Sequence, residues 1–213
     1  MDTKQLKMYA ACDKAIKELN RIFLEAFGRL KGRKFDRNLV KTILELYRKL
    51  AKLARKRYYE IGFEAYLLAM AVCDIEPKKA ARMAEKAITA EWVDMILSQT
   101  DLVTLYRFDT ETERKAYRLA EALEATDDRD YEVNKALRFW SQQVGQYAIN
   151  FTDYAETKAF EDAGVEMAEW VAVRDGRQCN ECMALDGQVF SIKEFPAKPH
   201  FGCRCRKRPV FRD

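Results

Sequence analysis

The uneven placement of proline, cysteine and histidine along this chain is the feature that most constrains its fold. Three of the four prolines, four of the six cysteines and the single histidine lie after residue 178. Residues 1–164 contain one proline, Pro77. Because proline interrupts helices and collects in turns, this distribution predicts a long helical body followed by a compact, turn-rich module.

We expect the helical body to span residues 1–164 and the C-terminal module to span residues 165–213, with the boundary near Gly164. The predicted fold class is mainly α: a bundle of long helices followed by a small α+β, turn-rich Cys/His module with short strands. A chain of 213 residues is long enough to bury a sizeable core without disulfides.

Apolar residues recur at steps of three and four in several stretches of the body, which is the spacing of one helical face. The predicted helices are one ending between Gly28 and Gly32, one from Asp36 to about Ile75, one from Pro77 through Ile96, one beginning at Thr110 or Thr112, and one from about Tyr131 to Asp162. The segment Leu102–Tyr106 is β-branched and aromatic, and it predicts a break between helices.

The pattern changes after Gly164. Trp170–Val173 is typical of a short strand, Arg174–Arg177 of a turn, and Leu185–Phe190 of an Asp-Gly turn that leads into a second strand. Strands this short bury little apolar surface, so the module needs a cross-link of some kind.

Charge and hydropathy exclude some classes of protein. The net charge of +4 is too small to indicate nucleic-acid binding by composition alone. The longest near-apolar run, Tyr66–Cys73, is far shorter than the roughly 20 residues that cross a bilayer, and the start of the chain has no signal-peptide pattern. We therefore expect a soluble, unexported protein with no membrane partner.

The C-terminal cysteines and histidine have the spacing of metal ligands. Cys179 and Cys182 form a C-x-x-C pair, and His200, Cys203 and Cys205 follow after an excursion of seventeen residues. Two ligand pairs separated in this way are typical of a structural zinc site. We predict zinc on four of these five residues, with three thiolates and His200 as the preferred set; the choice between Cys203 and Cys205 stays open.

The same cysteines and histidine could serve chemistry other than zinc binding. Disulfides among the four cysteines, in three possible connectivities, are the main alternative. A redox C-x-x-C lacks the βαβ context that it needs, and a catalytic zinc lacks a nearby general-base motif. A nucleophilic pair of His200 with Cys203 or Cys205 is disfavoured because their spacing is that of ligands. We expect Cys12 and Cys73 to be buried apolar residues, and we expect no enzyme activity.

Basic residues make the extreme C-terminus positively charged. These residues are Arg204, Arg206, Lys207, Arg208 and Arg212. Beside a zinc knuckle such a cluster can bind nucleic-acid phosphates, and it can equally be a solvated tail. A zinc-knuckle nucleic-acid-binding protein is therefore the alternative function.

The last 65 or so residues resemble the Mu F-protein-like family of phage head morphogenesis (minor head, or minor capsid) proteins. The resemblance rests on features in a fixed order, which are Ala155–Val165, Glu169-Trp170, Asp175, the C-x-x-C at Cys179, Leu185-Asp186-Gly187 with Phe190, Pro199-His200, and Cys203-Arg204-Cys205. The chain departs from the family pattern at Phe151-Thr152-Asp153, where an arginine is usual, and at Phe201-Gly202 after the histidine.

The resemblance implies a virion component rather than an enzyme. Such a protein is present in a few copies at the portal vertex or capsid interior, and it aids head assembly and the packaging or ejection of DNA. Its implied partners are portal and capsid proteins, with phage DNA and self-association left open, and it would pass through the host cytoplasm during assembly.

Overall fold

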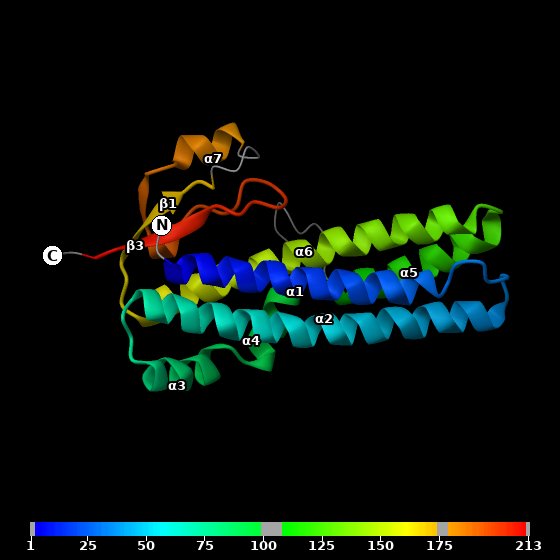
Figure 1. The fold of residues 1–213 in the computed structure, drawn as a ribbon, viewed down its shortest axis with the longest axis horizontal. Coiled ribbons are helices and arrows are strands. Elements are labelled where there is room, and N and C mark those ends of the chain that lie inside the picture. The colour runs from blue at the N-terminus through cyan, green and yellow to red at the C-terminus, as the bar shows by residue number, and fades with distance from the viewer. Residues whose placement is uncertain (1–2, 99–107, 174–178, 212–213) are drawn as a thin grey trace.

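A computed structural model of the chain describes residues 3–98, 108–173 and 179–211 (Figure 1). Its helices are α1 (Thr3–Gly28), α2 (Arg37–Val72), α3 (Pro77–Ala87), α4 (Ala90–Ser98), α5 (Phe108–Ala125), α6 (Arg129–Asp162) and α7 (Asn180–Leu185). Its strands are β1 (Met167–Val171), β2 (Val189–Ser191) and β3 (Arg206–Val210), and a 3₁₀ turn, η1 (Ile192–Glu194), follows β2. The predicted mainly α fold with a small α+β module is confirmed.

The long helices α1, α2 and α6 lie side by side along the long axis, and α5 packs against α2 and α6 (Figure 1). An aromatic cluster joins them, in which the ring centroids of Tyr47 and Trp140 are 5.4 Å apart and those of Tyr47 and Phe27 are 5.5 Å apart. Tilted and edge-on aromatic pairs of this kind stabilise a core beyond the area they bury.

A second core cluster lies where the bundle meets the sheet. Tyr66 and Met70 of α2, Phe160 of α6 and Ala168 of β1 are all buried in it. The first strand of the C-terminal module therefore packs into the same apolar cluster as the helix ends. The division of the chain into domains at residue 164 stays a prediction.

Two predicted helix ends have the expected capping residues. The Asp36 carboxylate accepts a hydrogen bond from the Leu39 N–H at 2.7 Å at the start of α2. After α6, Gly164 has φ +80°, and the Val165 N–H donates to the Phe160 carbonyl at 2.9 Å. This is a Schellman motif, whose left-handed residue favours glycine.

The single helix predicted from Pro77 through Ile96 is wrong, because two helices occupy this stretch. α3 ends at Ala87 with Ile88 as its C-cap, and α4 begins at Ala90. The Thr89 hydroxyl accepts a hydrogen bond from the Trp92 N–H at 3.2 Å, which is N-cap geometry. The apolar periodicity continues across the break, so periodicity alone hid this cap.

The sheet has the order β2-β1-β3, and both pairings are antiparallel. β1 is thus the central strand, and its Glu169 lies opposite Arg208 of β3. The sequence predicted β1 and β2 but neither β3 nor the short helix α7. The predicted break at Leu102–Tyr106, the predicted turn at Arg174–Arg177 and Arg212 lie outside the described residues.

Candidate metal centre

The C-x-x-C motif sits at the start of α7. Cys179 is the N-cap residue, and its Sγ accepts a hydrogen bond from the Cys182 N–H at 3.3 Å. The helical turn that follows brings the Cys182 side chain to the same side as Cys179, with Cys182 fully buried. The first turn of α7 therefore places both sulfur atoms on the side that faces the rest of the module.

His200 and Cys203 reach Cys182 from the opposite side, across the 3₁₀ turn and the proline-rich loop. The distance from Cys182 Sγ to His200 Nε2 is 3.3 Å, and that from Cys182 Sγ to Cys203 Sγ is 3.6 Å. His200 Nδ1 lies 2.9 Å from the Phe201 carbonyl oxygen. An Nδ1–H donor to this carbonyl leaves the Nε2 lone pair facing the thiols, which is how metal-binding histidines are commonly oriented.

Two overlapping groups of donor atoms meet around Cys182. The ligand atoms of Cys179, Cys182 and His200 lie within 4.8 Å of one another, and so do those of Cys182, Cys203 and Cys205. All five residues predicted as ligands thus come together in the fold, and this Cys/His cluster could hold a metal ion. Which four of the five coordinate it stays a prediction.

The spacing of the donor atoms suits a tetrahedral ion. Zinc bound at about 2.3 Å to sulfur and about 2.0–2.1 Å to nitrogen holds two sulfurs about 3.8 Å apart, and a sulfur and a nitrogen about 3.6 Å apart. Cys182 Sγ lies 3.6 Å from Cys203 Sγ and 3.3 Å from His200 Nε2, and both distances are close to those expected between two zinc ligands. Borderline-soft zinc also favours a thiolate and imidazole donor set.

Two of the buried thiols, those of Cys182 and Cys203, resist ionisation. Burial raises the pKa of Cys182 to about 12. A hydrogen bond with Cys205, together with burial, raises the pKa of Cys203, while the same hydrogen bond lowers that of Cys205 to about 5. A divalent ion would supply the positive charge that lets several buried thiolates coexist, and its binding would release protons.

None of the six cysteines forms a disulfide. Cys12 is buried as expected, and burial raises the pKa of its thiol to about 11. Cys73 is half-buried, at the C-cap of α2. The Asp186-Gly187 turn predicted after α7 is present, and the Asp186 carboxylate accepts a hydrogen bond from the Ala172 N–H at 2.8 Å.

Polar residues of α6 hold the loop that carries His200 and Cys203. Gln146 Oε1 accepts from the Gly202 N–H at 2.7 Å, and Gln146 Nε2 donates to Asn150 Oδ1 at 2.8 Å. Both side chains are buried. Their burial was not predicted from the sequence, because polar residues four apart in a helix usually face solvent.

A buried charge cluster lies beside this contact. Asp153 of α6 pairs with Lys198 at 3.1 Å and with Lys207, and Lys198 also donates to the Cys205 carbonyl. Burial opposes ionisation of Asp153, but the two ammonium groups outweigh it and lower its pKa to about 2. Glu156, one turn further along α6, is fully buried, and neither of its oxygens has a hydrogen-bond partner among the residues that the structure describes. Burial raises its pKa to about 7.

The four basic residues near the C-terminus that the structure describes are buried or have acidic neighbours. Arg206 and Lys207 are buried, and Lys207 binds Asp153. Arg208 forms an ion pair with Glu169 of the neighbouring strand. Because Arg206–Val210 is a paired strand, the interpretation of this segment as a solvated tail is wrong.

Arg204 lies 3.5 Å from Asp13 of α1, so this residue also has an acidic neighbour. Arg212 lies outside the described residues. A role of these five basic residues in nucleic-acid binding stays a prediction, and the ion pairs and burial reduce the charge that they could offer to phosphate.

Comparison with known proteins gives one match. Residues 118–208 match the family model described as "Phage Mu protein F like protein". This segment of the chain is therefore similar to that family. It covers all of α6, β1 and β2, the first part of β3 and the five candidate ligands.

No curated protein and no solved structure matches the chain. In the part of the chain that the structure describes, no helix is both long enough and apolar enough to span a membrane.

Proposed function

We propose that this chain is a minor head protein that acts at the portal or capsid during phage head assembly and the packaging or ejection of DNA. The observation that carries the proposal is the Mu F-like match over residues 118–208, which includes both α6 and the complete Cys/His cluster. In this function the helical bundle contacts portal or capsid subunits, and the C-terminal module is a rigid knob mounted on α6.

The cofactor that we propose is one structural zinc ion. Cys179, Cys182 and His200 supply three ligands, and Cys203 or Cys205 supplies the fourth. Zinc would join α7 to the segment before β3, and so hold together a module whose own buried cluster is small. Its role would be structural, because the surrounding thiols are buried.

The same geometry supports a non-catalytic role. Cys182, Cys203 and Cys205 are all buried, and His200 Nε2 faces the sulfur of Cys182. A nucleophile needs access to its substrate, whereas a structural ligand does not. We therefore propose that His200 and the cysteines have a structural role and not a catalytic one.

Mass spectrometry tests the metal. Protein purified from a reducing cytoplasm should carry about one zinc ion per chain under native conditions, and should lose it on denaturation with six free thiols. Cys182→Ser should abolish zinc binding, and either Cys203→Ser or Cys205→Ser, but not both, should do the same. Two disulfides and no metal would contradict a zinc site.

Co-expression tests the partner. The chain and the cognate portal protein should co-elute in size-exclusion chromatography, and a parallel run with the cognate capsid protein identifies which of the two is bound. A metal-free Cys182→Ser variant separates the roles of body and module, because loss of co-elution with retained helical content would assign the contact to the module. Failure to co-elute with either protein at several salt concentrations would contradict the proposed function.

A further inference from the structure

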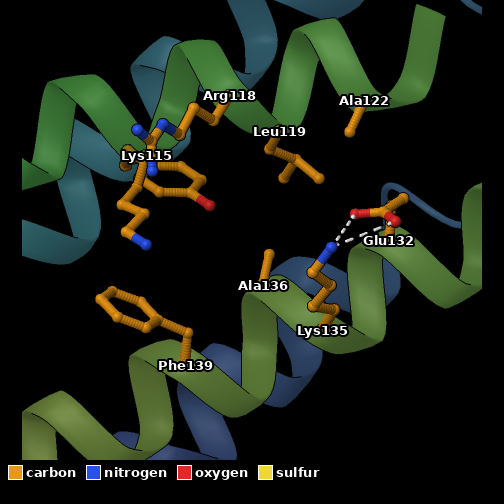
Figure 2. Close-up of a pocket in the computed structure, with 9 residues that line it drawn as sticks. Lys115, Arg118, Leu119, Ala122, Glu132, Lys135, Ala136 and Phe139 are labelled. Atoms are coloured by element: carbon orange, nitrogen blue, oxygen red, sulfur yellow. Dashed lines mark hydrogen bonds and ion pairs between the residues drawn. The ribbon is translucent and has the colours of Figure 1, made fainter. Parts of the chain in front are cut away.

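A pocket of about 300 Å³ lies between α5 and α6, away from the metal cluster (Figure 2). Leu119 of α5 and Ala136 and Phe139 of α6 give it an apolar lining. The neighbouring Lys115 ammonium lies 3.8 Å from the centroid of the Phe139 ring. This volume is at the lower end of the roughly 300–1,000 Å³ typical of ligand sites, so it suits one large side chain better than an extended organic ligand.

The mouth of the pocket is positively charged. Lys115, Arg118 and Lys135 surround it, with Glu132 as the acidic lining residue (Figure 2). Glu132 already binds Lys135, with distances of 3.3 and 3.4 Å to the ammonium. Arg118 is exposed and makes no ion pair with any residue that the structure describes. One guanidinium at the mouth is therefore available to an anionic ligand.

The environment of Lys115 also favours an anion at this place. Burial lowers the pKa of Lys115, and Arg118, Arg114 and Lys135 lower it further against the opposite effect of Glu111. Glu111 itself binds Arg114 at 3.0 Å. A carboxylate placed between Lys115 and Arg118 would relieve the repulsion between these cations.

We propose that this pocket binds an acidic, apolar peptide segment of a partner protein, with one aromatic or branched side chain on Leu119, Ala136 and Phe139 and a neighbouring carboxylate on Lys115 and Arg118. The pairing of an apolar floor with cations at the rim selects such a segment by shape and by charge together. The exposed rim, formed by Arg118 and Lys135, leaves room for the peptide to continue on either side. The site shares no residue with the candidate metal centre: it is formed by α5 and α6, with Tyr47 of α2 behind them.

Amide NMR with capped tetrapeptides tests the proposal. The probe Gly-Phe-Glu-Gly should shift the Leu119, Ala122 and Ala136 signals in a saturable way. The matched peptides Gly-Phe-Gln-Gly and Gly-Ala-Glu-Gly, which lack the charge and the ring, should each bind at least about fivefold more weakly. Binding should also weaken when salt is raised from about 0.05 to about 0.5 M.

Variants of the chain locate the site. Arg118→Met and Lys115→Met should each weaken the probe by about fivefold or more, because each removes one charge-assisted contact. Ala136→Phe should block binding by filling the pocket, with an unchanged circular dichroism spectrum as the check on folding. Lys78→Met, on the exposed face of α3, is the matched control and should leave affinity unchanged.

Three outcomes would overturn the proposal. The first is the absence of saturable shifts at millimolar probe. The second is an affinity for the probe that is the same in Arg118→Met and Lys115→Met as in wild type. The third is binding of free 3-phenylpropanoate as tight as that of the peptide, which would assign the pocket to a small aromatic acid. None of these outcomes bears on zinc content or on portal binding.

Discussion

At the scale of single residues, the junction between α6 and the C-terminal module depends on buried charge. Asp153 and Glu156 are three residues apart on one face of α6, and both turn toward the module. Asp153 has two ammonium partners, whereas neither Glu156 oxygen has a hydrogen-bond partner among the described residues. Two carboxylates one turn apart therefore have opposite pKa shifts, because one is paired and the other is only buried.

Glu156 makes stability depend on pH near neutrality. Its pKa rises from 4.5 to about 7 on folding, so the folded state binds a proton more tightly than the unfolded state. The free energy of unfolding should therefore fall as pH rises from about 4.5 to about 7. Urea denaturation of wild type and Glu156→Gln at pH 5.5 and pH 8 checks this: the variant should gain about 2 kcal/mol relative to wild type over that interval. A parallel pH dependence in both proteins would contradict it.

Asp153 is expected to give the free energy of unfolding the opposite pH dependence, because its pKa is lowered on folding. Asp153→Asn leaves Lys198 and Lys207 without their carboxylate, and should lower the free energy of unfolding by about 3 kcal/mol at pH 7. The folded pKa of Asp153 is about 2, compared with 3.8 for the free side chain, so the difference from wild type should shrink as pH falls through that range.

A surface ion pair is the control for Asp153. Glu169→Gln breaks the pair with Arg208, whose side chain is 57% exposed, and should cost less than about 1 kcal/mol. Equal losses for the two substitutions would mean that burial of Lys198 and Lys207 does not raise the energetic importance of Asp153.

At the scale of elements, capping residues determine where helices begin and end, and pairing with a neighbouring strand determines where β3 forms. Apolar periodicity indicates neither. Thr89 divides one apolar stripe into α3 and α4, and Cys179 begins α7 by capping it. β3 forms because β1 offers a free edge, and it brings the highly charged segment Arg206–Val210 into the sheet. Strand formation at this position depends on a partner more than on local preference.

Two helical glycines distinguish packing from helix propensity. A Cβ added at Gly62 of α2 would lie 2.8 Å from the Trp92 ring, whereas one added at Gly145 of α6 would have Ile16 at 3.8 Å. Gly62→Ala should therefore destabilise the protein by about 1–3 kcal/mol through overpacking of α2 against α4. Gly145→Ala should stabilise it by up to about 1 kcal/mol through helix propensity. Thermal melting of the two variants checks this, and stabilisation by Gly62→Ala would contradict the close α2–α4 contact.

At the scale of the whole molecule, the module is attached to the bundle by apolar and polar contacts together. Ala168 and Ile192 share a core cluster with Tyr66 of α2, while Gln146 of α6 binds the loop at Gly202. Arg204 adds a contact with α1. The bundle thus supports one side of the candidate metal site, and the metal would support the other.

Removal of the metal should have a local effect. A chelator should raise hydrogen exchange in residues 180–210 by about tenfold or more, because α7 and the segment before β3 lose their common cross-link. The amides of α2 and the first half of α6 should keep their protection, since their aromatic core does not contain the ligands. Exchange measured by mass spectrometry, with Cys182→Ser as the metal-free reference, checks this. Simultaneous loss of protection in α2 would contradict it.

The sequence was enough to predict the helices α1, α2, α5 and α6, the position of Gly164, the first two strands and the cluster of five candidate ligands. These features are local: they depend on apolar periodicity, on capping residues and on ligand spacing, which neighbouring residues specify by themselves. Only the tertiary structure decided that Arg206 and Lys207 are buried, that Gln146 orients the histidine loop, and that Asp153 and Glu156 titrate in opposite directions. These properties arise between segments more than 40 residues apart, where burial and the charge of the partner determine the energy and no local pattern records either.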